Sequence, residues 1–274
     1  MSIIKCPVCG QPLEIQPNGC TCAKNHQYDK AKQGYCNLLL SNQRFSKQPG
    51  DSKEMVLSRK SFLSKGYYQP LADKLCASIA EYVGRKAQPY HVLDAGCGEG
   101  YYLDSIQKTM PISLHYTGFD ISKEAVKQAA MRNKSITWLV AGSFHMPILT
   151  EQVDCLLHIF APVCEAEFHR VVKQGGCVIS VTPGKAHLYG LKQALYDQPY
   201  DNEEEEIVLD GFAVKCKAHI QYDIGLEHTE DIKNLLTMTP YFWRTNPDKI
   251  KALDELESLE TPVHFIVTVY EKVE

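Results

Sequence analysis

The sequence predicts an α/β fold, in which a doubly wound parallel sheet follows a small and separate N-terminal block. A short apolar run, Val92-Leu93, ends in an acid and a Gly-x-Gly-x-Gly turn, as buried parallel strands do where they pass into a helix. Beyond this turn, strand-like runs alternate with helical patterns, which is typical of a doubly wound sheet. The N-terminal block, residues 1–36, is set apart by closely spaced cysteines.

Length and cysteine content narrow the class of protein. A chain of 274 residues can bury a full α/β core and carry one small extra domain. Its 11 cysteines, without a signal-peptide pattern in residues 1–30, favour a reducing compartment and metal-binding or buried thiols over a disulfide framework. No apolar run approaches a membrane span. We therefore expect a cytoplasmic protein with no membrane partner.

Charge is unevenly distributed along the chain. The formal net charge of −4 argues against a generic nucleic-acid binder. Residues 1–70, however, hold 10 Lys and Arg against 4 Asp and Glu, a net charge of +6, whereas residues 71–274 have a net charge of −10. This asymmetry fits a basic recognition arm on an acidic body.

The N-terminal block has the spacing of a metal site. Cys6, Cys9, Cys22 and His26 form a C-x2-C-x12-C-x3-H pattern, which suits a closed tetrahedral Zn²⁺ site; unrelated buried cysteines are the alternative. Cys20 competes with Cys22 for the third place, and Cys22 is preferred because one short turn then presents both remaining ligands. Four protein ligands leave no open position on the metal, so its role would be to fold a block too short to hold a core alone.

Residues 26–39 are basic and aromatic, and two interpretations stay open. They could contact RNA phosphates and stack on bases. Equally, Tyr28, Tyr35 and Leu38 could pack the metal-binding block onto the body. Residues 40–50 are polar and end in Pro49-Gly50, as expected of a linker or loop.

Local patterns predict the main helices and strands. Asp51-Ser52 is typical of a helix start, and the pattern predicts a second helix soon after the first. Both helices are expected to precede and flank the first strand. Ser122 can cap a later helix. The expected helices cover residues 53–65, about 70–83 and 123–132, and the expected strands, besides 92–93, cover a run ending at 118–120, then 137–140, 153–162 with its exit, and 264–270.

The glycine-rich turn resembles motif I of class I S-adenosylmethionine (SAM) methyltransferases. Its Asp-x-Gly-x-Gly-x-Gly pattern places Gly96, Gly98 and Gly100 where backbone N–H groups can approach a ligand. The spacing is not that of a dinucleotide or phosphate loop, and SAM has no phosphate to seat. Asp120, 24 residues after Gly96, stands near the spacing at which an acid binds ribose hydroxyls; a helix-start acid without a ligand is the alternative.

Two further segments follow the same class. In class I methyltransferases the loop after the third strand, here 142–147, often covers the adenine ring, although Ser143 stands where Asp is common. Residues 167–176 resemble the post-motif segment before the fifth strand. The resemblance implies a class I SAM-dependent methyltransferase fold, a Rossmann-like doubly wound sheet, with a small N-terminal zinc-binding domain.

Nearly the whole chain is similar to the bacterial 23S ribosomal RNA (guanine-N1)-methyltransferases. The shared features, beside the zinc spacing, are HQYDKAKQGYCNLL (26–39), PGDSKEM (49–55), GYYQPL (66–71), LDAGCGEGYY (93–102), FAP (160–162), TPGKAHLYGLK (182–192), GF (211–212) and MTPYFWR (238–244). The resemblance implies zinc ligands Cys6, Cys9, Cys22 and His26. It implies SAM contacts at Tyr68, Gly98, Glu99 and His187. The glycine-rich motif and its spacing to the next acid predict three more, Gly96, Gly100 and Asp120.

This resemblance also implies an organisation and a substrate. Residues 1–38 would form a zinc-binding RNA-recognition domain, and residues 39–274 a SAM-dependent methyltransferase domain with N-terminal flanking helices. The methyl acceptor would be N1 of one guanine in a 23S rRNA hairpin near the peptide exit tunnel, and the enzyme would be a homodimer. The alternatives are a SAM-dependent methyltransferase of another RNA, a small molecule or a protein, and a non-catalytic RNA-binding module.

Guanine chemistry sets what the site must do. N1 carries a proton and lies on the Watson–Crick edge, so the base must be unpaired or flipped out. Transfer needs in-line positioning, and a base would help. No residue is assigned as that base: Phe160-Ala161-Pro162 lacks the leading Asp or Asn of amino-group methyltransferases, and His158 is expected to pack within its strand.

The C-terminal third is less informative. Residues 201–206 include four consecutive glutamates and are expected to be a solvated tip. Residues 219–232 and 241–249 could shape the target pocket or simply cover the sheet.

Overall fold

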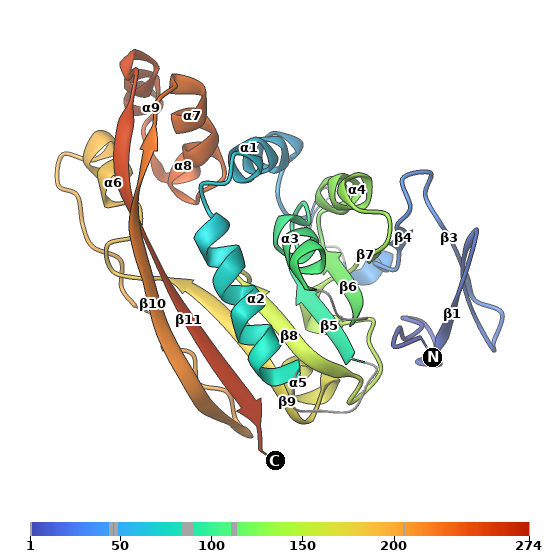
Figure 1. Cartoon of the computed structure of the whole chain (residues 1–274). Helices are drawn as coiled ribbons and strands as arrows, with labels where there is room; N and C mark the ends of the chain where they lie inside the picture. Colours follow the sequence, from blue (N-terminus) through green and yellow to red (C-terminus); the bar gives the residue numbers. More distant parts are fainter. Residues whose placement is uncertain are drawn as a thin grey trace.

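A mixed eight-stranded sheet organises the computed structural model, which describes residues 2–43, 46, 49–83, 90–110, 114–204 and 206–273 (Figure 1). The strand order is β10-β11-β9-β8-β5-β6-β7-β4. The strands are β4 (Cys36–Asn37), β5 (Tyr90–Ala95), β6 (Leu114–Asp120), β7 (Thr137–Val140), β8 (Val153–Ile159), β9 (Val172–Pro183), β10 (Phe212–Leu226) and β11 (Leu259–Lys272).

The side of the sheet to which successive strands are added changes at β5. This strand pairs in parallel with β6 on one side and with β8 on the other. Parallel pairing continues from β6 to β7 and from β8 to β9, whereas β11 is antiparallel to both β9 and β10. In such sheets the crevice for a ligand opens at the carboxyl ends of the two strands that flank the reversal.

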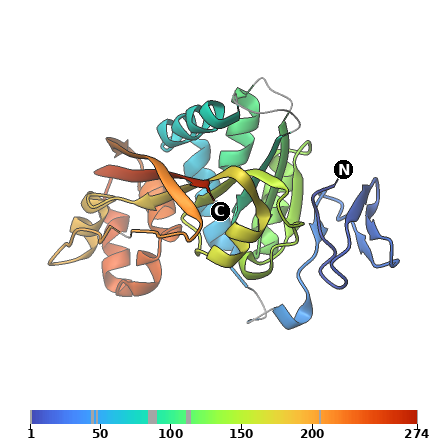
Figure 2. The same ribbon diagram turned by 90° about the horizontal axis from the view of Figure 1, so that it is seen from below.

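Helices cover the two faces of this sheet. Adjacent β5 residues point to opposite faces: Val92 joins the core beneath α2 and α3, whereas Leu93 joins the core that includes Phe168 of α5. Figure 2 shows the sheet between these layers. The layer helices are α1 (Lys53–Ser64), α2 (Gln69–Val83), α3 (Tyr101–Thr109), α4 (Lys123–Arg132) and α5 (Glu165–Val171).

Further short helices gather beside α1, at one end of the long β10 and β11 strands (Figure 1). Leu235 and Leu236 of α7 are buried in the same core as Phe62 and Leu63 of α1. The group comprises α6 (Tyr189–Leu195), α7 (Thr229–Thr237), α8 (Tyr241–Arg244) and α9 (Pro247–Ala252). Within the described ranges, none of the helices has the length and apolar character needed to cross a bilayer.

The N-terminal block forms its own three-stranded antiparallel sheet, in the order β1 (Leu13–Gln16), β2 (Gly19–Cys22) and β3 (Gln27–Asp29). The block is also tied to the body, because β4 pairs in parallel with β7 at the edge of the large sheet. Tyr35 and Leu38 are buried in the two cores of the body, as the packing interpretation requires. Tyr28 is partly buried against the same core as Leu38, and its hydroxyl lies 3.3 Å from Sγ of Cys6.

Most of the expected elements are confirmed. The helix expected over 53–65 is α1, and Ser52 caps it by accepting a hydrogen bond from the backbone N–H of Met55. Helix 123–132 and strand 137–140 have the expected bounds. The fourth strand ends at Ile159, and the last strand is longer than expected, at Leu259–Lys272.

The C-terminal third holds the main addition. Residues 212–226 form one 15-residue edge strand, and residues 229–237 form α7. Asp201, Glu203, Glu204 and Glu206 are exposed, as expected of a solvated tip, while Glu205 lies outside the described residues. Residues 44–45 and 47–48 of the expected linker also lie outside them.

Candidate functional site

The turn after β5 depends on glycine at three positions. Gly96, Gly98 and Gly100 have φ of 87°, 54° and 83°, in the left-handed region that side-chain-bearing residues avoid. A Cβ on Gly96 would lie 2.9 Å from Cβ of Ala161, and one on Gly100 would lie 2.8 Å from the Trp138 ring. Gly96 and Gly100 are therefore also required for packing, whereas Gly98 has more open surroundings.

Asp120 lies directly beside this turn, as its sequence spacing predicts. Its Oδ2 accepts a hydrogen bond from the backbone N–H of Gly98 at 3.0 Å, and Oδ1 accepts one from that of Ser122 at 2.8 Å. Burial raises the pKa of this carboxyl, and these two backbone hydrogen bonds oppose the rise. Each oxygen keeps a lone pair, so the group can still accept from the hydroxyls of a ribose.

Two more acids are buried at the turn. Asp94 and Glu99 are each 1% exposed, and among the described residues Oδ1 of Asp94 and Oε1 of Glu99 have no hydrogen-bond partner. Burial, and secondarily the charge of Asp120, raise the pKa of Asp94 to about 8. Buried acceptors without partners are costly. A ligand with ammonium and hydroxyl donors, such as SAM, fits this surplus of acceptors.

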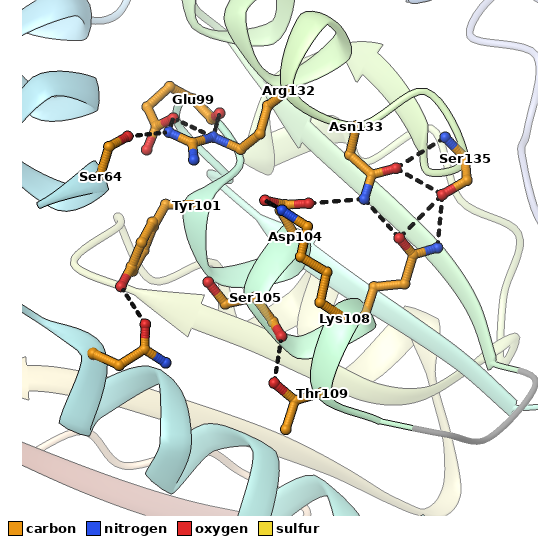
Figure 3. A network of polar contacts seen from close by, with 12 residues as sticks. Ser64, Glu99, Tyr101, Asp104, Ser105, Lys108, Thr109, Arg132, Asn133 and Ser135 are labelled. Carbon is orange, nitrogen blue, oxygen red and sulfur yellow. Dashed lines mark hydrogen bonds and ion pairs between the residues drawn. The ribbon is translucent and has the colours of Figure 1, made fainter. Parts of the chain in front are cut away.

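Glu99 is also a structural anchor of the turn (Figure 3). Its Oε2 accepts from Nε and Nη2 of Arg132 at 2.8 and 2.5 Å, and Nη2 also donates to Oγ of Ser64 at 3.1 Å. Asn133, which follows Arg132 at the end of α4, donates to Asp104 of α3 at 2.9 Å. The turn is thus fixed between α1, α3 and α4.

An aromatic cluster brings Tyr68 and His187 together from distant parts of the chain. Both side chains are buried, and their ring centroids are 6.3 Å apart. The ring of Phe265 packs against both, with its centroid 4.8 Å from that of Tyr68 and 5.0 Å from that of His187. Nδ1 of His187 accepts the backbone N–H of His264 at 3.2 Å, and burial lowers the pKa of His187 to about 3. The imidazole is therefore neutral at physiological pH, with its hydrogen on Nε2.

The segment after β8 presents an exposed aromatic ring, that of Phe160, for which the sequence analysis proposed no role in binding. Phe160 has φ of 51°, unusual for an aromatic residue, and is 45% exposed. Its ring lies nearly parallel to that of His187, with centroids 6.1 Å apart. The backbone strain and the exposure of a large apolar ring both point to a role in binding. An aromatic residue immediately after a buried strand was the available signal.

His158 is packed within β8, as expected, and it supports the segment that follows this strand. Its Nδ1 lies 2.9 Å from Oγ of Ser180, and its Nε2 lies 2.5 Å from the carbonyl oxygen of Ala161. The side chain is buried, and burial lowers its pKa. Both ring nitrogens are engaged, so His158 acts as a support for the Phe160–Pro162 segment.

The four candidate zinc ligands converge in the N-terminal sheet. The ligand atoms of Cys6, Cys9, Cys22 and His26 all lie within 4.8 Å of one another. Sγ of Cys9 lies 3.6 Å from Sγ of Cys22, which in turn lies 3.4 Å from Nδ1 of His26. In a zinc tetrahedron with ordinary bond lengths these separations are about 3.8 and 3.6 Å. The donor set and its spacing therefore fit zinc.

Cys20 lies outside this cluster. Its Sγ lies 3.3 Å from Sγ of Cys36. Of the two alternatives for the third ligand position, the geometry therefore favours Cys22. Burial raises the pKa of Cys6, but hydrogen bonds from Tyr28 and from the backbone of Cys9 and Val8 outweigh it and lower the pKa to about 6. A thiolate, the form that binds metal, is thereby favoured.

Known proteins match both the N-terminal region with the cysteine cluster and the region with the glycine turn. Residues 4–47 match the family model described as "RlmA, N-terminal", a zinc ribbon, and residues 92–176 match a methyltransferase domain. A protein of Micromonospora griseorubida, named as a 23S rRNA (guanine-N(1)-)-methyltransferase, is 30% identical over 280 residues, covering 95% of this chain and 92% of that protein. The chain belongs to the 23S rRNA (guanine-N1)-methyltransferase family. It is a SAM-dependent methyltransferase with an N-terminal zinc ribbon.

Other relatives of this methyltransferase carry related names. YxjB of Bacillus subtilis, also named for 23S rRNA guanine-N1 methylation, is 29% identical over 279 residues, covering 96% of this chain and 94% of the relative. The 23S rRNA (guanine(748)-N(1))-methyltransferase of Streptomyces fradiae is 29% identical over 252 residues, covering 90% and 88%. The similarity thus spans both the zinc ribbon and the methyltransferase domain.

Proposed function

We propose that this methyltransferase transfers the methyl group of SAM to N1 of a guanine in a hairpin of 23S rRNA. The observation that carries the proposal is the similarity to relatives named for this reaction along 95% of the chain, which includes the zinc ribbon as well as the catalytic sheet. A methyltransferase of another RNA, a small molecule or a protein is the alternative. The basic N-terminal region, with net charge +6 over residues 1–70, favours RNA.

The cofactor site proposed here lies at the carboxyl ends of β5 and β6. SAM supplies an electrophilic methyl group on a sulfonium, and the chain supplies binding and orientation. Asp120 accepts ribose hydroxyls, and the backbone at Gly98 approaches the ligand closely. The proposed set, which includes the neutral His187 as a hydrogen-bond donor, is Tyr68, Gly96, Gly98, Glu99, Gly100, Asp120 and His187.

The acceptor base is proposed to stack on Phe160. Its exposed ring follows β8, and Gly96 of the cofactor turn lies against Ala161 of the same segment. A flipped guanine on this ring would therefore lie beside the cofactor turn. Both ring nitrogens of His158 are engaged, and the low pKa of His187 makes its imidazole a poor proton acceptor, so neither is assigned as the group that takes the N1 proton.

The zinc ribbon is proposed to read the RNA backbone. Zinc held by Cys6, Cys9, Cys22 and His26 would be structural, because four protein ligands leave no open position on the metal. The same N-terminal region has an open hollow of about 370 Å³, lined by Pro17, Asn18, Lys30, Ala31, Lys32 and Gly34. Its two lysines, with Lys24 nearby in sequence, suit phosphate groups.

Assembly and location are proposed from the same resemblance. The enzyme is proposed to be a homodimer, and light scattering on the purified protein would test this. A cytoplasmic location is supported by the eleven cysteines, none of which forms a disulfide.

Modification mapping tests the central proposal directly. We expect N1-methylguanine at one position of 23S rRNA in cells with the gene, its loss on deletion, and its return on complementation. A variant with Gly98→Val should not complement. Unchanged 23S rRNA modification in the deletion strain, or equal methylation of free guanosine by the purified enzyme, would contradict the proposal.

A further inference from the structure

Arg59 of α1 reaches over the turn that follows β5. A Cβ built on Gly98 would lie 3.8 Å from Nη1 and 3.9 Å from Cδ of Arg59. Nη1 of Arg59 pairs with the carboxylate of Asp51, and Nη2 donates to the carbonyl oxygen of Met238 at 3.3 Å. One guanidinium thus joins the segment before α1, the end of α7 and the proposed cofactor turn.

Three buried acids lie at this turn. Asp94, Glu99 and Asp120 all lie within electrostatic range of the Cys97 thiol in this turn, and burial raises the pKa of each. The positive charge of Arg59 opposes that rise at Glu99 and at Asp120, which places the guanidinium within electrostatic range of both.

Two neighbouring cationic side chains, Arg132 and Lys60, already have hydrogen-bond partners in the protein. Arg132 is bound to Glu99 and Ser64, and Nζ of Lys60 donates to Oε1 of Gln128 at 3.0 Å. Arg59 differs from both because it alone of the three lies within 4 Å of the Cβ position of Gly98, and it remains 26% exposed.

The chemistry of the ligand calls for such a cation. The amino-acid end of SAM carries an ammonium, which the acids of the turn suit, and a carboxylate, which they repel. A guanidinium binds a carboxylate through charge-assisted hydrogen bonds, and it has five N–H donors, of which Asp51 and Met238 use only part. We propose that Arg59 binds the carboxylate of SAM; this inference rests on the proposed function.

Asp51 would then be a positioning residue. Its backbone carbonyl accepts from Oγ of Ser122 at 2.9 Å, which fixes the segment next to the loop that follows Asp120. A Cβ on Gly50 would meet Ile121 at 2.9 Å, so this segment lies tightly on the same loop. The carboxylate of Asp51 therefore holds the guanidinium of Arg59 over the turn before the ligand arrives. This lowers the entropic cost of ordering the Arg59 side chain on binding.

Calorimetry with two ligands tests the proposal. SAM and decarboxylated SAM are titrated into the full-length wild type, Arg59→Gln, Arg59→Met and the neighbouring control Lys60→Gln. Wild type and Lys60→Gln should bind SAM roughly ten- to a hundredfold more tightly than the decarboxylated ligand, the range for hydrogen bonds to charged groups. Both Arg59 variants should bind the two ligands about equally, and one folded variant of the two is sufficient.

The outcomes separate this inference from the proposed function. If the Arg59 variants keep the wild-type preference for SAM, or lose affinity for both ligands equally, Arg59 does not bind the carboxylate. Wild type that binds SAM without any preference would overturn the inference and leave the cofactor assignment intact. Wild type that binds neither ligand would overturn the proposed function itself.

Discussion

Three glycines in one turn have different neighbours, and the difference predicts different roles. Gly96 and Gly100 are confined by Ala161 and Trp138, so replacing either would disturb packing as well as any ligand. Gly98 has only the flexible Arg59 side chain within 4 Å of its Cβ position. A substitution at Gly98 therefore tests the ligand side of the turn.

Gly98→Val should lower SAM affinity at least about tenfold, because a β-branched residue strains the left-handed backbone and adds bulk where the ligand approaches. Calorimetry measures the effect. Gly34→Val is the control: Gly34 also has a positive φ, of 109°, with nothing within 4 Å of its Cβ position, but it lies in the N-terminal region. Equal SAM affinity in wild type and Gly98→Val would refute the site.

Asp94 gives a pH dependence. Its folded pKa of about 8 lies above its ordinary value of 3.8, so the folded state holds a proton that the unfolded chain releases. The stability that this group contributes is present below pH 3.8 and is lost as pH rises through about 8. Asp94→Asn removes this titration, so its melting temperature should fall less than that of wild type between pH 4 and 8, without SAM. Parallel curves for the two proteins would contradict this.

Phe160 should matter for RNA more than for the cofactor. Stacking of a base on an aromatic ring contributes about 1–3 kcal/mol, so Phe160→Ala should lower kcat/KM for the rRNA hairpin roughly ten- to a hundredfold. Phe160→Trp keeps a ring and should retain most of the activity. The proposed base platform is wrong if the alanine variant turns over the hairpin as wild type does.

At the scale of elements, local signals were predictable and non-local pairing was not. The cap at Ser52 and the periodicity of residues 123–132 are encoded within a few residues, and both helices form as expected. β10 was not predicted, because it is an edge strand with one exposed face and its sequence mixes Lys, His, Gln and Asp among apolar residues. The two-residue β4 joins the large sheet through its pairing with β7, about a hundred positions away in the chain.

The candidate site divides in the same way. Asp120 and the glycine turn follow from spacing, because adjacent parallel strands end at one edge of the sheet. The cluster of Cys6, Cys9, Cys22 and His26 follows from spacing too. Arg59 and Phe160 gave no spacing signal, since their positions depend on how α1 and the segment after β8 pack against the turn.

The zinc ribbon allows a matched pair of cysteine variants. Cys9→Ser should reduce bound zinc from about one per chain towards zero and weaken RNA binding, because the metal stabilises this small sheet. SAM affinity should barely change. Cys20→Ser is the control, because Cys20 contacts Cys36 and not the cluster, so zinc should remain bound. Metal content, SAM titration and RNA titration are measured on the same samples; loss of SAM binding with intact RNA binding would contradict the division of roles.

For the whole molecule, the ribbon is both a separate sheet and part of the body. Ile3, Ile4 and Leu13 share one apolar core with Phe119 and Leu139 of the central sheet. This packing fixes a basic region against an acidic body, so RNA bound to the ribbon, as proposed, would be held at a set position relative to the proposed catalytic turn. Such fixed placement suits an enzyme that must present one base of a shaped hairpin.

This charge distribution predicts how salt affects RNA binding. Each phosphate contacted by a lysine releases counterions, so log K should fall linearly with log salt concentration. Neutralising Lys30 and Lys32 together, as Lys30→Gln with Lys32→Gln, should weaken binding and reduce that slope by about 2. Lys215→Gln with Lys217→Gln is the control, because these exposed lysines lie on β10, at the edge of the sheet opposite β4. Fluorescence anisotropy of the labelled hairpin from about 50 to 200 mM salt measures both slopes. An equal change of slope in the two pairs, or affinity that is flat with salt in wild type, would show that the ribbon lysines do not contact the RNA backbone.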